Sequence, residues 1–263
     1  MKIPGRLITI FTGLVSLLIA TTLPASAAVA EREVELTVVG GPMAPFIQAQ
    51  EKSATGFVPD LIREALSRAL LKAQIEIYPW ERAFKMVSNS PAILHMSLAR
   101  TRHREKEFTW IYPLFRAEAA FVTLTRKKSF PDVDKKTTRI CVLSQTPMLG
   151  YLRQNGYRRI IESPDNYSCA RLLKRGRVDV IFSGWFTTLH AFKTEGLDSK
   201  YLRRGKTLMF VDVYLAASPQ MDAKIIERLR TAVRSVIGDG TFNSYLARYN
   251  LQGLTLPKPG KLQ

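Results

Sequence analysis

A cluster of cationic side chains follows an apolar run in the first half of the chain. Residues 92–98 predict a buried strand, and residues 100–104 then carry three arginines and a histidine. A guanidinium at a strand end offers a planar pair of N–H donors that match the two oxygens of a carboxylate. Trp80 opens the preceding predicted helix, where its ring would wall the same site. The alternative is a solvated basic loop beside an ordinary core tryptophan, and composition alone leaves both interpretations open.

Motifs that would mark a catalytic or metal centre are missing from the sequence. There is no His-Glu-x-x-His, Cys-x-x-Cys, Gly-x-Ser-x-Gly, Gly-x-Gly-x-x-Gly or P-loop pattern. His95 falls within the predicted buried strand, where we expect a core residue whose hydrogen bonds are satisfied, and His190 falls on a predicted helix. Four glutamates are candidate acids or bases, although solvated carboxylates are the better interpretation: Glu51, Glu81, Glu105 and Glu107. We therefore predict that the protein is not an enzyme and uses no metal or cofactor.

The first 27 residues have the pattern of a cleaved export signal. Lys2 and Arg6 precede an uncharged apolar stretch, residues 7–23, and Ala25-Ser26-Ala27 supplies the small residues that signal peptidase requires. We expect cleavage after Ala27, with Ala30 as the second choice. The alternative is a membrane anchor, because the stretch approaches the length that spans a bilayer. Pro24 and the cleavage site argue against an anchor, so we predict a periplasmic protein.

The chain is strongly basic, with 39 Lys and Arg against 22 Asp and Glu, a formal charge of +17. Removal of residues 1–27 would leave about +15. Such a balance suits nucleic acid, an acidic surface or anionic small molecules. The cations are spread along the chain without a nucleic-acid motif, and export separates the protein from nucleic acid, so an anionic ligand is the favoured partner.

Cys141 and Cys169 are the only cysteines. In an oxidising compartment an even pair favours a disulfide, and the alternative is two buried free thiols. Cys141 and Cys169 are 28 positions apart, and a bridge between them would add about 3 kcal/mol to the free energy of unfolding in the chain-entropy model.

The elements that would position these residues alternate between strands and helices. Hydrophobic periodicity predicts strand, helix, strand, helix and strand at residues 33–39, 57–71, 74–78, 80–88 and 92–98. A strand at 119–124 and a basic linker at 126–138 come next. After the linker we predict strands at 139–143, 159–162, 178–183 and 208–217, and helices at 147–155, 167–175, 224–237 and 241–249. This order predicts an α/β fold of two lobes with a ligand cleft between them.

The motifs along the chain resemble those of the bacterial extracellular solute-binding proteins of family 3, the receptors of polar amino acid ABC transporters. The likeness covers nearly the whole mature chain, and each motif is weak alone, but six occur in the family's order. They are Pro45-Phe46 after the first strand, Gly56-Phe57-Val58-Pro59-Asp60-Leu61, the set Thr101, Arg104, Trp110 and Pro113, the stretch 140–146, Gly176-Arg177-Val178-Asp179, and Asp239-Gly240-Thr241 with Tyr249.

The resemblance implies a type II periplasmic binding protein fold with two hinge strands. Lobe 1 would comprise residues 31–121 plus 213–263, and lobe 2 residues 122–212. A monomer would capture a small carboxylate-bearing solute and deliver it to an ABC permease in the inner membrane. Two alternatives remain on this scaffold: a dehydratase-like enzyme, and a sensor for a membrane signalling partner.

The resemblance also implies which residues bind the ligand. Arg104 would hold the carboxylate, with Thr146 closing over it from lobe 2; lobe 1 would add Trp80, Met43, Ser97, Ala99 and Thr101. Members that bind α-amino acids place carboxylates around the ammonium group, but the matching positions here are Gly40 and Gly184. Gln145 replaces the family glycine before Thr146, and Cys141 replaces a small residue. A small organic acid, or an amino acid held differently, is therefore as good an expectation as a standard amino acid.

Overall fold

The computed structural model describes Met1 and residues 35–50, 53–125 and 129–257. Apart from Met1, the described residues belong to one unit, Val34–Gln263. The predicted export signal therefore lies outside the described residues except for its first methionine. None of the helices in these ranges has the length and apolar character needed to cross a bilayer.

The first half of the unit is a group of parallel strands with helices on both faces. Its strands are β1 (Leu36–Gly40), β4 (Ala73–Ile77) and β5 (Ile93–Ala99), in the order β4-β1-β5. Their helices are α1 (Phe57–Arg68), α2 (Trp80–Ser88), α6 (Ala223–Gly238) and α7 (Thr241–Arg248). The predicted apolar stripe of α1 is buried with α6 and α7 on one face, whereas α2 packs on the other.

The second half repeats this arrangement. Its parallel strands are β7 (Ile140–Leu143), β8 (Ile160–Ser163) and β9 (Val180–Gly184), in the order β9-β7-β8. Its helices are α3 (Pro147–Gln154), α4 (Asn166–Lys174) and α5 (Trp185–Thr194). Helices α4 and α5 share one apolar core, and α3 packs into another. The disulfide Cys141–Cys169, with a Cα–Cα distance of 5.6 Å, ties α4 to β7, so the cysteines are bridged as expected.

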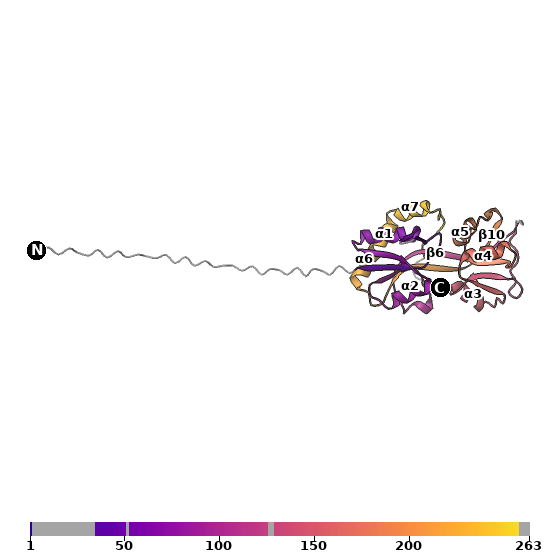
Figure 1. The fold of residues 1–263 in the computed structure, drawn as a ribbon, viewed down its shortest axis with the longest axis horizontal. Coiled ribbons are helices and arrows are strands. Elements are labelled where there is room, and N and C mark those ends of the chain that lie inside the picture. Colours follow the sequence, from indigo (N-terminus) through magenta and orange to yellow (C-terminus); the bar gives the residue numbers. More distant parts are fainter. Residues whose placement is uncertain (2–34, 51–52, 126–128, 258–263) are drawn as a thin grey trace. The chain divides into compact units, whose positions relative to one another are not determined.

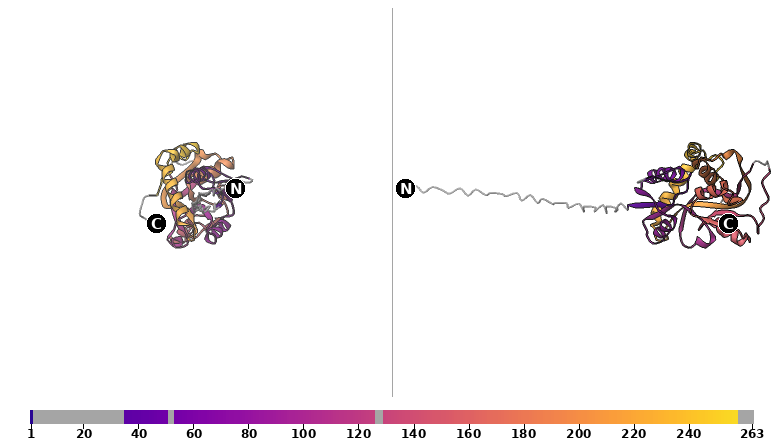
Figure 2. Two further views of the ribbon diagram at one scale, coloured as in Figure 1. Left: turned by 90° about the vertical axis from the view of Figure 1, so that its left-hand side faces the viewer. Right: turned by 45° about the vertical axis from the view of Figure 1, so that its right-hand side comes forward.

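Two long antiparallel strands join the halves. β6 (Thr109–Leu124) and β10 (Leu202–Ala217) pair along their whole length, so that all eight strands form one sheet, β4-β1-β5-β10-β6-β9-β7-β8. Figure 1 shows α1, α2, α6 and α7 on one side and α3, α4 and α5 on the other, with β6 running between them. The right-hand view of Figure 2 shows β10, in orange, passing from one half to the other.

Strand direction decides which edges of the two parallel groups meet. β6 runs from the first half to the second, is antiparallel to β10 and β9, and β10 is antiparallel to β5. The carboxyl end of β5 therefore points toward the second half, and the carboxyl ends of β7 and β9 point toward the first. Loops that follow these strands, which carry most of the predicted site residues, lie between the two halves.

Several elements differ from the sequence-based predictions. β6 begins ten residues earlier than predicted because Pro113 and the charged residues after it break the apolar pattern. This early segment nevertheless pairs with β10 on one edge, while β9 pairs with the other edge only from Ala119 to Val122. No residue ranges were predicted from the sequence for four features of the structure. They are helix α5, the hairpin of β2 (Gln48–Gln50) with β3 (Ser53–Thr55), and the single turns η1 (Arg102–Arg104) and η2 (Ser199–Tyr201). Only glycine fits at position 56, just before α1. Its φ is +118°, and a Cβ there would lie 2.6 Å from the carbonyl oxygen of Phe46.

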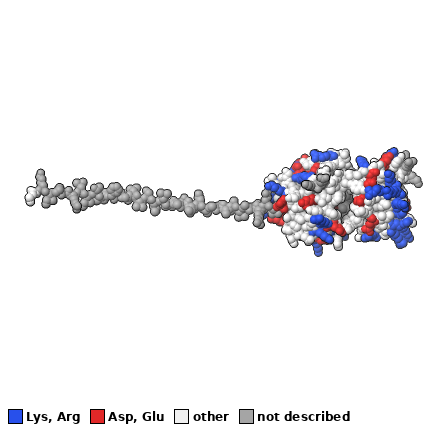
Figure 3. All heavy atoms as spheres, viewed as in Figure 1, with Lys and Arg blue, Asp and Glu red and all other residues white. Residues whose placement is uncertain are grey.

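The surplus of positive charge is concentrated in the second half. Residues 122–212 carry 18 Lys and Arg against 8 Asp and Glu. Figure 3 shows Lys and Arg gathered at the end of the unit that lies beyond α3 and α4.

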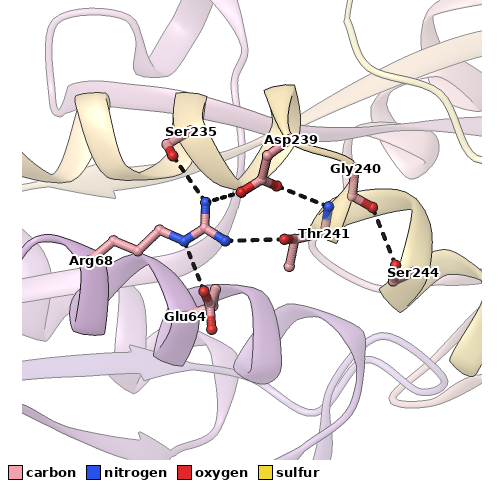
Figure 4. A network of polar contacts seen from close by, with 7 residues as sticks. All are labelled: Glu64, Arg68, Ser235, Asp239, Gly240, Thr241 and Ser244. Atoms are coloured by element: carbon pink, nitrogen blue, oxygen red, sulfur yellow. Dashed lines mark hydrogen bonds and ion pairs between the residues drawn. The ribbon is translucent and has the colours of Figure 1, made fainter.

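The Asp239-Gly240-Thr241 motif is structural. Arg68 of α1 donates hydrogen bonds to the side chains of Glu64, Ser235, Asp239 and Thr241, at distances of 2.5–3.0 Å (Figure 4). Asp239 also accepts from the Thr241 amide at 3.0 Å, which lowers the pKa of its carboxyl to about 2. This network fastens α1 to the junction of α6 and α7, far from the loops that face the second half.

Candidate functional site

Arg104 ends the turn η1, which follows the carboxyl end of β5. Thr101 precedes this turn, and its side-chain oxygen accepts a hydrogen bond from the Arg104 amide at 3.4 Å. A threonine at this position holds the first turn of the loop, as an N-cap does for a longer helix. The Thr-x-x-Arg spacing therefore sets where Arg104 leaves the sheet.

The guanidinium of Arg104 lies against aromatic rings. Its Cζ is 4.8 Å from the centre of the Trp80 ring and 5.2 Å from that of Phe84, and Nη1 donates a long hydrogen bond of 3.4 Å to the carbonyl of Ala99. No carboxylate among the described residues pairs with it. Because burial penalises the charged form, the pKa of Arg104 lies below its ordinary value. This half-buried cation has unused donors that a carboxylate would satisfy.

The neighbouring arginines differ from Arg104 in their contacts. Arg100 donates to both oxygens of Glu105, at 3.0 and 2.5 Å, and stacks over Trp110 and Tyr214. Arg102 is exposed to solvent. Within the described ranges, Arg104 is thus the cation of this loop that is both partly buried and without an acidic partner, a distinction that the local sequence does not make.

His95 is buried, as predicted, but its hydrogen bonds are not satisfied. Its Nδ1 accepts from the Ser97 amide at 3.1 Å, while its Nε2 is buried without a partner. The prediction of a satisfied core histidine is therefore wrong. The irregular pairing of β5 between Ala216 and Tyr214 accompanies the bond from the Ser97 amide to Nδ1, but Nε2 points into the core, where no polar group among the described residues reaches it. Desolvation, with a smaller effect of the charge on Arg104, lowers the pKa of His95 to about 3.

The other residues predicted from the first half lie at strand ends. Ser97 and Ala99 are half-buried on β5, and Met43 is half-buried in the loop after β1. Gly41 follows β1, and a Cβ there would lie 3.4 Å from Cβ of Trp80, so the backbone passes close to the indole. Met43 makes no hydrogen bond or ring contact with Arg104, whereas Trp80, Ala99 and Thr101 do contact it.

Side chains of the second half reach the first at two points. The ring of Phe186, in α5, lies edge-on to that of Phe46 with centroids 6.4 Å apart, and the second point is a hydrogen bond. Gln145, in the turn between β7 and α3, donates from Nε2 to Oε1 of Glu81 at 2.6 Å. Its φ is +58°, the left-handed region that favours glycine. The sequence singled out both residues separately but not their contact. Thr146 next to it immediately precedes α3, and its hydroxyl donates to the carbonyl of Leu143 at 2.8 Å, without a contact to Arg104.

The end of β9 presents neutral polar groups. The Ser183 hydroxyl lies 3.1 Å from the side-chain oxygen of Asn166 and 3.2 Å from the Thr187 hydroxyl, which donates to the Gly184 carbonyl. Gly40 and Gly184 contribute no charge at the two strand ends. In the part of the chain that the structure describes, no three His, Cys, Asp or Glu side chains are grouped as metal ligands would be.

Phe84 is a contact of Arg104 that the sequence analysis missed. It is four residues after Trp80, one turn further along α2, and the two rings stack with centroids 5.1 Å apart. Helical spacing places residues i and i+4 on one face, so this signal was present in the sequence.

Comparison with known proteins agrees with this architecture. The family model for bacterial extracellular solute-binding proteins, family 3, matches residues 36–252. No curated protein sequence matches the chain.

Solved structures with the same fold are distant in sequence. A histidine kinase sensor domain with similarity to periplasmic binding proteins has a TM-score of 0.74 at 16% identity, covering 86% of this chain and 99% of that one. The GluR0 ligand-binding core from Nostoc punctiforme, in complex with L-glutamate, has a TM-score of 0.71 at 16% identity, with 82% and 99% covered. The arginine-, lysine-, histidine-binding protein ArtJ from Geobacillus stearothermophilus has a TM-score of 0.70 at 18% identity, with 85% and 97% covered.

These relatives share the type II periplasmic binding protein fold, as the sequence predicted. The family match spans most of the chain, including β1, the Arg104 loop and α7. The chain belongs to the bacterial extracellular solute-binding proteins, family 3.

Proposed function

We propose that this protein captures a small carboxylate-bearing solute, an amino acid or an organic acid, and delivers it to an ABC permease in the inner membrane. The observation that carries the proposal is Arg104, a half-buried guanidinium stacked on Trp80 and Phe84 without an acidic partner among the described residues. A ligand carboxylate would accept two parallel hydrogen bonds from it. The aromatic rings hold the guanidinium plane, so little order has to be gained on binding.

The two halves would act as lobes that close on the solute. We assign residues 31–121 plus 213–263 to lobe 1 and residues 122–212 to lobe 2, with β6 and β10 as the hinge. Arg116 and Asp212 form a bidentate ion pair where these strands pass between the halves, with Nε 2.5 Å from Oδ1 and Nη2 2.7 Å from Oδ2. Both side chains are nearly buried. Such a pair would keep the strands together while residues on either side rotate.

The surroundings favour a ligand without a strongly held ammonium group. An ammonium that is buried without an acidic partner is costly. Gly40 and Gly184 stand at the strand ends, and Ser183, Asn166 and Thr187 offer only neutral groups. Thr146, Met43, Ser97, Ala99 and Thr101 would complete the contacts. We therefore propose a ligand with one anionic end and a neutral body, bound by a periplasmic monomer without covalent change.

A second candidate is ligand sensing for a membrane signalling partner. The histidine kinase sensor domain among the structural relatives favours it, since the same fold serves a receptor there. Both candidates need the same capture step and differ only in the partner.

A thermal-shift screen of amino acids, organic acids and polyamines tests the capture step. A ligand that binds only the folded state raises the melting temperature by mass action. Arg104→Ala should weaken binding of the carboxylate ligand by about 100-fold, because a desolvated charge pair contributes several kcal/mol. Arg104→Lys should recover only part of it, since an ammonium lacks the planar fork.

Arg102→Ala is the matched control, because Arg102 is exposed in the same turn. It should leave the ligand-induced shift unchanged. An undiminished shift in Arg104→Ala, or an equal loss in both variants, would show that Arg104 is not the anchor.

A further inference from the structure

A second group of cations lies at the end of the second half that faces away from Arg104. Parallel strands β7, β8 and β9 run toward the first half, so their amino ends point away from it. The loops at those ends carry exposed cations that we call the basic pole: Lys135, Lys136, Arg158, Arg159, Lys174, Arg175 and Arg177.

Hydrogen bonds to backbone carbonyls join these loops into one surface. The Arg158 amide donates to the carbonyl of Lys135 at 2.9 Å, and Nη1 of Arg159 donates to the Thr137 carbonyl at 3.4 Å. The Asp179 amide, two residues after Arg177, donates to the Arg139 carbonyl at 2.9 Å. The cations of three separate loops are therefore held side by side, and Figure 3 shows Lys and Arg covering this end of the unit.

The carboxylates near the pole neutralise it only in part, since Asp134 attracts Lys136 and Asp179 attracts Arg159 without forming an ion pair with them. Asp179 pairs with Arg139, and Asp134 accepts from the amides of Lys136 and Thr137 and from the Thr137 hydroxyl. None of the seven cations of the pole forms an ion pair within the described residues. Their charge is thus available to an external anion.

The pole lacks what a protein interface needs. Interfaces between proteins have a buried core of apolar and aromatic side chains. The large apolar side chains exposed near the pole are Leu124 and Ile161, which are 36% and 38% exposed and stand on strands separated in the sheet by β9 and β7. Affinity must come from dispersed charge, which suits the closely spaced phosphates of a lipid surface.

We propose that the basic pole binds the surface of a bilayer that contains anionic phospholipids. Binding by many separate cations concentrates the protein at the membrane and leaves the Arg104 site free, because that site lies at the opposite edge of the strands. The proposal is independent of which solute Arg104 holds.

Vesicle flotation of the full chain tests this proposal, with phosphatidylcholine vesicles compared with vesicles that also contain phosphatidylglycerol. The pole variant carries Lys136→Gln, Arg158→Gln and Arg175→Gln. Each cation at an anionic surface strengthens binding about fivefold, so we expect about 100-fold weaker binding to the anionic vesicles. Added salt should also weaken binding of the unaltered protein.

The matched control carries Lys85→Gln, Lys224→Gln and Arg234→Gln, three exposed cations of the first half with the same total charge change. It should bind the anionic vesicles nearly as well as the unaltered protein, and its melting temperature and that of the pole variant should agree. All three proteins share residues 1–33, so a difference in binding between them comes from the substituted cations.

Three results would overturn the proposal. They are equal loss in the two variants, equal binding to both kinds of vesicle, and binding to polyglutamate without binding to anionic vesicles, which would assign the pole to an acidic protein. A ligand-induced thermal shift that persists in the pole variant would show that the solute site has not been affected.

Discussion

Gln145 both destabilises and stabilises the protein: its backbone conformation is strained, while its side chain makes a hydrogen bond to Glu81. The left-handed backbone of Gln145, with φ +58°, costs about 1 kcal/mol relative to an ordinary conformation. The 2.6 Å hydrogen bond to Glu81 is charge-assisted but solvent-exposed, so it contributes about 1 kcal/mol. Because it joins α2 to the turn before α3, we expect it to stabilise only the arrangement in which the halves are close.

Gln145→Gly removes both terms. The strain disappears, offset in part by the greater freedom of glycine in the unfolded chain, so the free energy of unfolding without ligand should rise by no more than about 1 kcal/mol. Loss of the hydrogen bond should lower the population of the closed arrangement and speed ligand release about fivefold. Thermal unfolding and stopped-flow dissociation of a ligand found by the screen measure the two effects.

Gln145→Ala and Glu81→Ala separate the terms. Both remove the hydrogen bond, and neither relieves the strain, so each should speed release without raising stability. Two results would contradict this reasoning. If Gln145→Gly lowers the melting temperature, the backbone of Gln145 is not strained. If all three variants release the ligand at the unaltered rate, the hydrogen bond to Glu81 does not hold the halves together.

Three further predictions follow from buried groups. Replacing Cys141 and Cys169 by serine should lower the free energy of unfolding by about 3 kcal/mol, because the bridge closes a 28-residue separation, and urea titration would show it. The unfolded chain binds a proton at His95 that the folded state, with a pKa of about 3, does not. Stability should therefore fall below about pH 6.5, by up to ~1.4 kcal/mol per unit, and His95→Gln, unlike His103→Gln, should flatten this dependence in melts at several pH values. Asp212→Asn should cost about 3 kcal/mol in urea unfolding because it strands its arginine partner, whose side chain is 11% exposed; a change under 1 kcal/mol would contradict the importance of the pair.

Most of the regular elements were predictable because their signals are local. The helix predicted at residues 80–88 has those bounds, and α1 and α6 differ from prediction by a few residues at their ends. Periodicity, caps and breakers act within one or two turns of chain. The long strand β6 was only partly predicted because a strand that crosses from one core to another loses the alternation that a single buried face imposes.

The candidate site was predictable only as a neighbourhood. The cluster at residues 100–104 could be placed at a strand end from the sequence, but the arginine that remains unpaired could not. Arg100 is occupied by Glu105 nearby and by the ring of Tyr214, which arrives from β10. Arg104 lies instead on Trp80 and Phe84 of α2.

The sequence by itself determined the α/β order of elements, the family, and the cationic character of the loop after β5. Tertiary structure alone decided that Gln145 meets Glu81, that His95 keeps an unpaired nitrogen, and that the cations of three loops form one pole. The physical reason is that propensity and motif act through neighbouring residues, whereas pairing and burial depend on strand directions that bring distant segments together.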